Sequence, residues 1–139
     1  MKILIICTGN SCRSQMAHGF LKSFNPTLNV YSCGIKPEVK VNPYAVKVMQ
    51  EVGIDIGNHL PVRVEEYINK SFDYVFTVCD IARKMCPDFT GEINNWLHVA
   101  FEDPVNYKGT LEQKLNEYRR IRDQILESFK ELYNCRLLK

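Results

Sequence analysis

The chain has 139 residues and a formal net charge of +2, with 45% hydrophobic and 24% charged residues. This length fits one domain with a single sizeable core, so we expect one domain over residues 1–139. The small charge favours neither nucleic acid nor a membrane surface as a partner. The apolar run after Lys2 is shorter than the roughly 7–15 residues of a signal-peptide core, and no run approaches the about 18 of a membrane span. We expect a cytoplasmic protein.

Residues 2–7 form a nearly continuous apolar run, which is typical of a strand covered on both faces. Residues 13–24 carry apolar side chains at a spacing of four and predict a helix that Asn25 and Pro26 end. Residues 28–34 alternate and predict a second strand. Residues 42–53 have proline near the start and glycine at the end, which is typical of a helix.

The second half of the chain continues this alternation. Residues 64–70 are a weaker helix candidate, residues 73–79 predict another buried strand, and residues 93–101 predict the last strand. Residues 110–133 carry apolar side chains at steps of three and four, which predicts a long amphipathic helix. Thr110 and Gln113 have the spacing of a capping box at its start.

Alternating strands and helices predict an α/β fold, a small doubly wound parallel four-stranded sheet with helices on both faces. Ligands of such folds bind beyond the carboxyl ends of the strands. Three segments rich in reactive side chains follow predicted strands, beginning at Cys7, at Cys79 and at Glu102. We therefore expect the functional site at this edge.

The first of these segments is "CTGNSCRS", residues 7–14. A loop of this length can direct backbone N–H groups at a tetrahedral oxyanion, and the helix that follows adds its positive N-terminal dipole. Gly9 permits the backbone conformations that such a loop needs, and Asn10 tolerates them and can anchor the loop. Arg13 can donate two hydrogen bonds to two anion oxygens.

Cys7 lies at the base of this loop, where the same field favours its thiolate and Ser14 can donate a hydrogen bond to it. Cys7 is therefore the candidate nucleophile toward the central atom of a bound oxyanion. The expected oxyanion-binding loop comprises Thr8, Gly9, Asn10, Ser11, Cys12 and Ser14. Cys12 could form a protective disulfide with Cys7, but we expect a structural role for it. The alternative for the whole segment is a turn of small residues with incidental cysteines.

These residues resemble the Cys-x5-Arg-Ser loop of the low-molecular-weight protein tyrosine phosphatases. Asp103-Pro104 resembles the general-acid loop of that family. The resemblance implies that Asp103 protonates the leaving oxygen. The alternative is that Asp103 and Pro104 only form a turn.

A second resemblance involves "VCDIARKMC", which contains Cys79 and Cys86. Phosphate ester hydrolysis needs no thiol besides Cys7, whereas reduction of an oxyanion needs two electrons, which thiols can supply. The three cysteines resemble those of the thioredoxin-coupled arsenate reductases that share the phosphatase fold. The likeness extends through "TGNSCRSQMA", "NVYSCGI", "IDIGNH" and "FEDP".

The resemblance implies a single catalytic domain that acts on arsenate or phosphate-type oxyanions. Cys7 would attack arsenate, Cys79 would displace arsenite from Cys7, and Cys86 would take over the disulfide from Cys7 by attacking Cys79. Reduced thioredoxin would be the electron donor, with no bound cofactor and a monomeric enzyme. The alternative is that Cys79 and Cys86 are buried apolar residues. Residues 80–86 predict a short helix with Asp80 as its N-cap, which oxidation would unwind.

The chain departs from the family at several positions. Some members bind potassium with an asparagine, a serine and two carboxylates; Asn10 and Ser32 match, but His18 and Val62 replace the carboxylates. We therefore predict no metal. The tyrosine pair that often follows Asp-Pro is reduced to Tyr107, which weakens phosphotyrosine recognition.

The remaining reactive side chains have no assigned role. Without a Cys-x-x-Cys pair or clustered histidines, the sequence gives little support for zinc. We expect Cys33 and Cys135 to be packing residues and His59 to be a turn residue. Two alternatives to the reductase remain: a phosphatase that hydrolyses phosphate monoesters through a Cys7 phosphocysteine, and a non-enzymatic binding domain.

Overall fold

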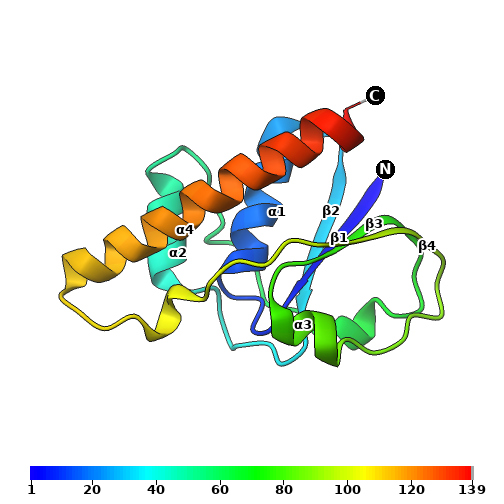
Figure 1. Cartoon of the computed structure of the whole chain (residues 1–139), viewed down its shortest axis with the longest axis horizontal. Helices are drawn as coiled ribbons and strands as arrows, with labels where there is room; N and C mark the ends of the chain where they lie inside the picture. Colours follow the sequence, from blue (N-terminus) through cyan, green and yellow to red (C-terminus); the bar gives the residue numbers. More distant parts are fainter. Residues whose placement is uncertain (139) are drawn as a thin grey trace.

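The computed structural model describes residues 1–138 and contains a four-stranded sheet in the order β2-β1-β3-β4 (Figure 1). Its strands are β1 (Lys2–Cys7), β2 (Asn29–Gly34), β3 (Phe72–Thr77) and β4 (Ile93–His98). Every pairing is parallel, and Cys7 at the end of β1 is paired with Gly34 at the end of β2. The predicted four-stranded parallel sheet is confirmed.

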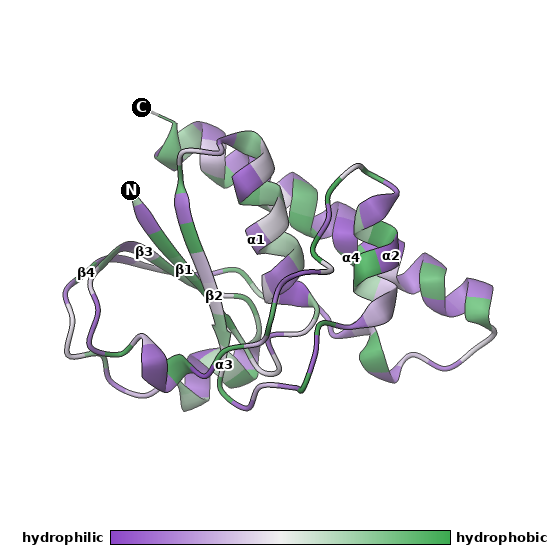
Figure 2. Ribbon diagram, turned by 180° about the vertical axis from the view of Figure 1, so that it is seen from behind, coloured by the Kyte–Doolittle hydropathy of each residue, from purple (hydrophilic) through white to green (hydrophobic). Residues whose placement is uncertain are grey.

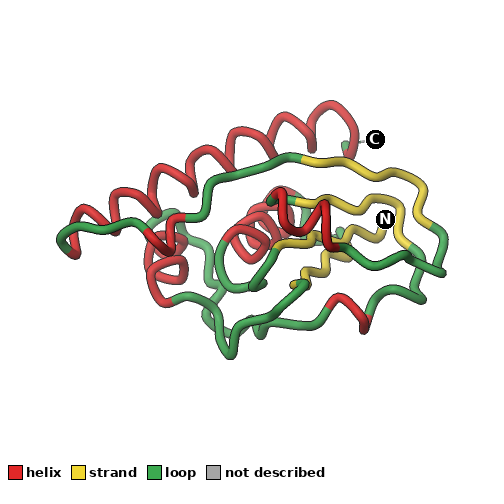
Figure 3. The backbone as a smooth tube through the Cα atoms, turned by 60° about the horizontal axis from the view of Figure 1, so that its bottom comes forward, coloured by secondary structure: helices red, strands yellow, loops and turns green. Residues whose placement is uncertain are grey.

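Four α-helices connect and cover these strands: α1 (Arg13–Phe24), α2 (Pro43–Gln50), α3 (Asp80–Met85) and α4 (Leu111–Leu132). Figure 3 shows them alternating with the strands along the chain. Short helical turns are η1 (Val64–Glu66), η2 (Pro104–Asn106) and η3 (Tyr133–Leu137). The helix expected over residues 64–70 is thus only a 3-10 turn, in which Val64 alone is buried.

Both faces of the sheet are covered, as the doubly wound prediction requires. Tyr31 is aligned with Leu4 and Phe76 with Ile5, so Tyr31 and Phe76 point to opposite faces. The Phe76 ring contacts Phe129 of α4, with 5.3 Å between ring centroids. The Tyr31 ring contacts Tyr67 beside η1, at 5.7 Å. Helix α4 therefore covers one face, and the segment around η1 covers the other.

Helix α4 is amphipathic, and Figure 2 shows hydrophilic and hydrophobic residues alternating along it. Its buried residues recur every three or four positions: Leu115, Tyr118, Ile121, Ile125 and Phe129. The capping box of Thr110 and Gln113 is present. Two further residues of α4, Arg119 and Arg122, both form ion pairs with Glu51, the C-cap of α2. Within residues 1–138, no helix is both long and apolar enough to cross a membrane.

Candidate active site

The loop between β1 and α1 is held by Asn10. Its φ of 52° is the one left-handed conformation of a non-glycine residue among residues 1–138, so Asn10 rather than Gly9 supplies the unusual backbone. The Asn10 side chain donates to Ser14 Oγ at 2.8 Å and accepts from the Val62 backbone N–H at 2.8 Å. The anchoring expected of Asn10 is present, and it ties the loop to a segment 52 residues further along the chain.

Cys7 is 2% exposed, and its Sγ lies 2.9 Å from Ser14 Oγ and 3.1 Å from the Asn10 backbone N–H. Burial raises the pKa of the Cys7 thiol, and the hydrogen bond from Ser14, the Arg13 charge and the Asn10 N–H only partly oppose it. The contacts expected to favour the thiolate are present, and desolvation of the buried sulfur opposes them. That the thiolate is the favoured form stays a prediction.

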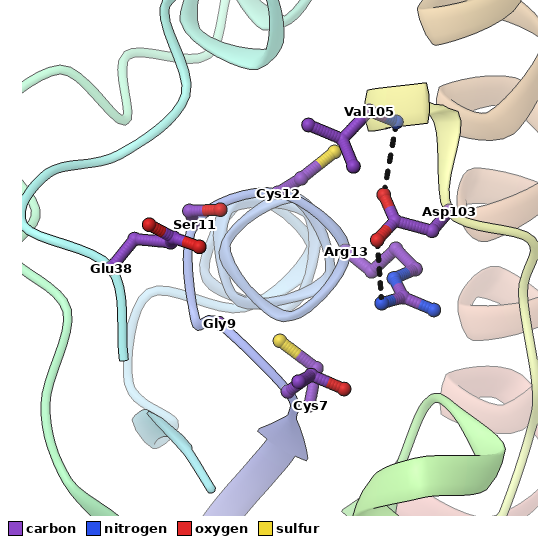
Figure 4. Close-up of a pocket in the computed structure, with 9 residues that line it drawn as sticks. Cys7, Gly9, Ser11, Cys12, Arg13, Glu38, Asp103 and Val105 are labelled. Atoms are coloured by element: carbon purple, nitrogen blue, oxygen red, sulfur yellow. Dashed lines mark hydrogen bonds and ion pairs between the residues drawn. The ribbon is translucent and has the colours of Figure 1, made fainter. Parts of the chain in front are cut away.

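Cys7 opens into a cavity of about 90 Å³ (Figure 4). This is far below the about 300–1,000 Å³ of a pocket for a drug-sized ligand and is on the scale of a small oxyanion. The cavity is lined by Cys7, Thr8, Gly9, Ser11, Cys12, Arg13, Glu38, Asp103 and Val105. Glu38 was not anticipated: it belongs to a loop without a motif, and its Cγ would lie 3.0 Å from a Cβ added at Gly9.

Arg13 and Asp103 meet at one side of this cavity (Figure 4). Arg13 is 8% exposed; its Nη2 lies 3.3 Å from Asp103 Oδ2, and its Nη1 donates to the Phe101 carbonyl at 3.0 Å. The second oxygen of Asp103 accepts from the Val105 N–H. The two-point contact of Arg13 with an anion stays a prediction, since both terminal nitrogens bond the 101–103 segment here.

Cys79 is the second thiol near the loop. It is 3% exposed, and its Sγ lies 3.2 Å from Thr8 Oγ1. Its Sγ also accepts from the Ala82 N–H at 3.4 Å, so the N-cap of α3 is Cys79 and not Asp80, which is the first helical residue. Asp80 instead bonds His98. A thiol next to the loop therefore also caps a helix.

Cys86 is the C-cap of that same helix and is half-buried. Burial, and secondarily the nearby Asp88 carboxylate, raise the pKa of the Cys86 thiol. A rise of about 1.5 Å per residue over the seven steps from Cys79 to Cys86 gives about 10 Å. A disulfide requires Cα atoms within about 4.4–6.8 Å. The two cysteines can therefore bond only after α3 unwinds.

The other three cysteines differ in their surroundings, and all six are free. Cys12 and Cys33 are buried, and burial raises the pKa of both thiols. Cys33 is a packing residue, as expected. Cys135 is exposed on η3, so the prediction that it is a packing residue is wrong. It lies just beyond the last buried turn of α4, where the amphipathic pattern ends.

His59 was expected to be a turn residue, but through Gln15 it supports the loop between β1 and α1. Its Nδ1 lies 2.9 Å from Gln15 Oε1, and Gln15 Nε2 donates to the Asn10 carbonyl at 3.0 Å. The His59 ring also contacts His18, with 4.6 Å between ring centroids. Burial, together with His59, lowers the pKa of His18 to about 4, so its imidazole is neutral at pH 7.

This region does not fit the potassium ion that some family members bind. His18 bonds Ser32 through Nδ1 at 3.1 Å, and Val62 offers Asn10 a backbone donor rather than a carboxylate. Hard cations require oxygen ligands, preferably charged ones. Across residues 1–138, no three His, Cys, Asp or Glu side chains form a group that could hold a metal ion.

A buried cysteine ends the first strand of the parallel sheet, an arginine begins the helix that follows, and an Asp-Pro turn lies across the cavity. Together these features define a class of enzymes that act through a cysteine in an oxyanion-binding loop. Residues 2–139 match the family "Low molecular weight phosphotyrosine protein phosphatase", and the chain belongs to this family.

Among its relatives, the arsenate reductase of Halalkalibacterium halodurans is 42% identical over 124 residues, 88% of each chain. The arsenate reductase of Bacillus subtilis is 42% identical over 130 residues, 93% of this chain and 92% of that one. A solved structure described as "An arsenate reductase in the phosphate binding state" superposes with a TM-score of 0.78 at 33% identity, over 96% of each chain.

Proposed function

We propose that this protein reduces arsenate to arsenite through Cys7, Cys79 and Cys86, with reduced thioredoxin as the electron donor. One observation carries the proposal: the buried Cys79 thiol lies 3.2 Å from Thr8 of the loop that begins at Cys7. Ester hydrolysis has no use for a second thiol at this place. Relatives named arsenate reductases support the reaction, and the phosphate-bound structure supports a tetrahedral oxyanion as the substrate class.

The first step joins Cys7 to arsenic. The Cys7 thiolate attacks As(V), a sulfur–arsenic bond forms, and one arsenate oxygen leaves as water after Asp103 has supplied a proton. Ser14 and the Asn10 N–H stabilise the thiolate, since both lie within about 3 Å of the sulfur. The positive charge of Arg13 also lowers the pKa of this thiol. Arsenic remains As(V) in the product of this step.

The second step transfers the electrons. The Cys79 thiolate attacks Cys7 Sγ, the sulfur–arsenic bond breaks, and its electron pair stays with arsenic, which leaves as arsenite, As(III). Two thiols have then been oxidised to a Cys7–Cys79 disulfide, which balances the two electrons that arsenic has gained. No bound cofactor is needed.

The third step moves the disulfide. Once α3 has unwound, the Cys86 thiolate attacks Cys79 Sγ and releases the Cys7 thiolate. A dithiol of thioredoxin then reduces the Cys79–Cys86 disulfide and is itself oxidised. We propose the cytoplasm as the compartment, because it supplies reduced thioredoxin, and a monomer as the active form.

The test is arsenate-dependent NADPH oxidation in the presence of thioredoxin and thioredoxin reductase. We expect oxidation that requires arsenate, thioredoxin and this protein together. Phosphate in place of arsenate is the control, because it occupies the same loop but accepts no electrons from thiols. No oxidation above that control would overturn the proposal.

A second candidate function is phosphatase activity, favoured by one observation: Cys7, Arg13 and Asp103 already line one cavity without help from Cys79 or Cys86. Hydrolysis through a Cys7 phosphocysteine would need only these three. Turnover of an aryl phosphate without any reductant, in a preparation inactive toward arsenate, would favour this function over the first.

A further inference from the structure

His98, at the end of β4, bonds two other elements at once. Its Nδ1 lies 2.7 Å from Thr77 Oγ1 at the end of β3, and its Nε2 lies 3.0 Å from Asp80 Oδ1 at the start of α3. A carboxylate only accepts hydrogen bonds, so Nε2 carries the hydrogen and a neutral Nδ1 accepts from the Thr77 hydroxyl. Both bonds are therefore available to a neutral imidazole.

Helix α3 has few other attachments. It contains six residues, of which Ala82 alone is buried, while Ile81 is 55% and Met85 64% exposed. A helix this short is unstable on its own. In the part of the chain that the structure describes, the Asp80–His98 contact is the only side-chain hydrogen bond from α3 to another strand or helix.

The other side-chain contact at the start of α3 is the Cys79 cap, which is a sulfur acceptor at 3.4 Å from the Ala82 N–H. Once Cys79 attacks Cys7, its sulfur becomes part of a disulfide and loses the charge that makes a thiolate a good acceptor. At that stage the His98–Asp80 bond is the remaining side-chain hydrogen bond on the first turn of the helix.

We infer that His98 is a positioning residue that latches the start of α3 and sets how readily this helix unwinds for bond formation between Cys79 and Cys86. The inference rests on the proposed function, because only the cysteine relay requires α3 to unwind. The latch opposes unwinding, so its removal should speed the transfer of the disulfide from Cys7 to Cys86. It should leave the chemistry at Cys7 unaffected.

Two variants test the latch. His98→Phe keeps an aromatic ring but loses both hydrogen bonds of His98. Asp80→Ala loses only the bond between α3 and His98 and leaves His98 bonded to Thr77. Glu92→Gln, which changes an exposed carboxylate near the start of β4, is the control. Each reduced protein is mixed with arsenate without thioredoxin, quenched at intervals, and its disulfides are mapped by mass spectrometry.

We expect both variants to form the Cys79–Cys86 disulfide about two- to five-fold faster than wild type, a range set by the net free energy of one solvent-exposed hydrogen bond. Amide hydrogen exchange over residues 80–86 of the reduced protein should rise by a similar factor. Aryl-phosphate hydrolysis should be unchanged, and combining the two substitutions should add nothing further, because they remove one interaction.

Disulfide transfer that is unchanged or slower in both variants would overturn the latch, as would a loss of aryl-phosphate hydrolysis. Failure of the relay itself has a different signature, since wild type would then form no Cys79–Cys86 disulfide. In that case amide exchange alone decides: faster exchange in both variants supports the latch, and equal exchange overturns it.

Discussion

Replacing Gly34 with alanine should damage the active site without touching a reactive group. Gly34 is paired with Cys7 across the sheet, and a Cβ at this position would lie 2.7 Å from the Thr8 carbonyl oxygen and 3.0 Å from the Asn10 nitrogen. Both atoms belong to the loop backbone. Ordinary contact begins at 3.4 Å, so the loop must move by about 0.7 Å, which is 3.4 minus 2.7. Misplacement of about 1 Å can lower a rate by about 100-fold.

We therefore expect kcat/KM of Gly34→Ala to fall by about ten- to a hundredfold in aryl-phosphate and arsenate assays. Urea unfolding should show a loss of about 1–3 kcal/mol from overpacking, with the protein still folded. Gly57→Ala is the matched control, because its Cβ would meet side chains and no backbone, Asp55 Oδ1 at 3.1 Å and Val46 Cγ1 at 3.6 Å. A folded Gly34→Ala protein with wild-type kcat/KM would refute the reasoning.

Three other substitutions test separate parts of the account. Cys7→Ser should abolish arsenate reduction and aryl-phosphate hydrolysis together, and either activity near the wild-type level would remove Cys7 as the shared nucleophile. Ser14→Ala removes a hydrogen bond that lowers the pKa of Cys7, so the acid limb of the kcat/KM profile should move to higher pH; an unmoved limb would contradict this role. Arg119 and Arg122 lower the pKa of Glu51 from 4.5 to about 2. The ionised Glu51 therefore stabilises the folded protein above pH 4.5, and this stabilisation is lost as the pH falls toward 2. In urea, Glu51→Gln should cost at most about 1 kcal/mol at pH 7, because the pair is partly exposed, and nothing near pH 2; an equal loss at both would argue against the ion pair.

The strands and the long helices could be predicted because their signals are local. The apolar run of residues 2–7 and the three-and-four spacing along residues 110–133 each follow from one element burying its own side chains. Arg13, Asp103 and Cys79 could be expected near Cys7, because the carboxyl ends of parallel strands meet at one edge. How deeply the site is buried could not be predicted from the sequence. The sequence indicates which groups stabilise a thiolate, but not that desolvation of Cys7 outweighs them.

The contacts that sequence reasoning missed join residues far apart in the chain. The support of Asn10 by Gln15 and His59 spans 44 residues, and nothing in the neighbourhood of His59 distinguishes it from a turn residue. The same holds for His98, whose partners lie on two other elements. The N-cap of α3 was placed one residue late, because sulfur is a weak acceptor and Asp80 is the better N-cap by type.

The central claim is that Cys79 resolves the adduct on Cys7, and a single-turnover experiment with Cys79→Ser tests it most directly. Reduced wild type and variant are each mixed with arsenate without thioredoxin, and arsenite and disulfides are measured, with aryl-phosphate hydrolysis followed in parallel. We expect about one arsenite per chain and a Cys79–Cys86 disulfide in wild type. For Cys79→Ser we expect no arsenite but normal hydrolysis of the aryl phosphate. Arsenite formation by Cys79→Ser at the wild-type level, or equal loss of both activities, would contradict the claim.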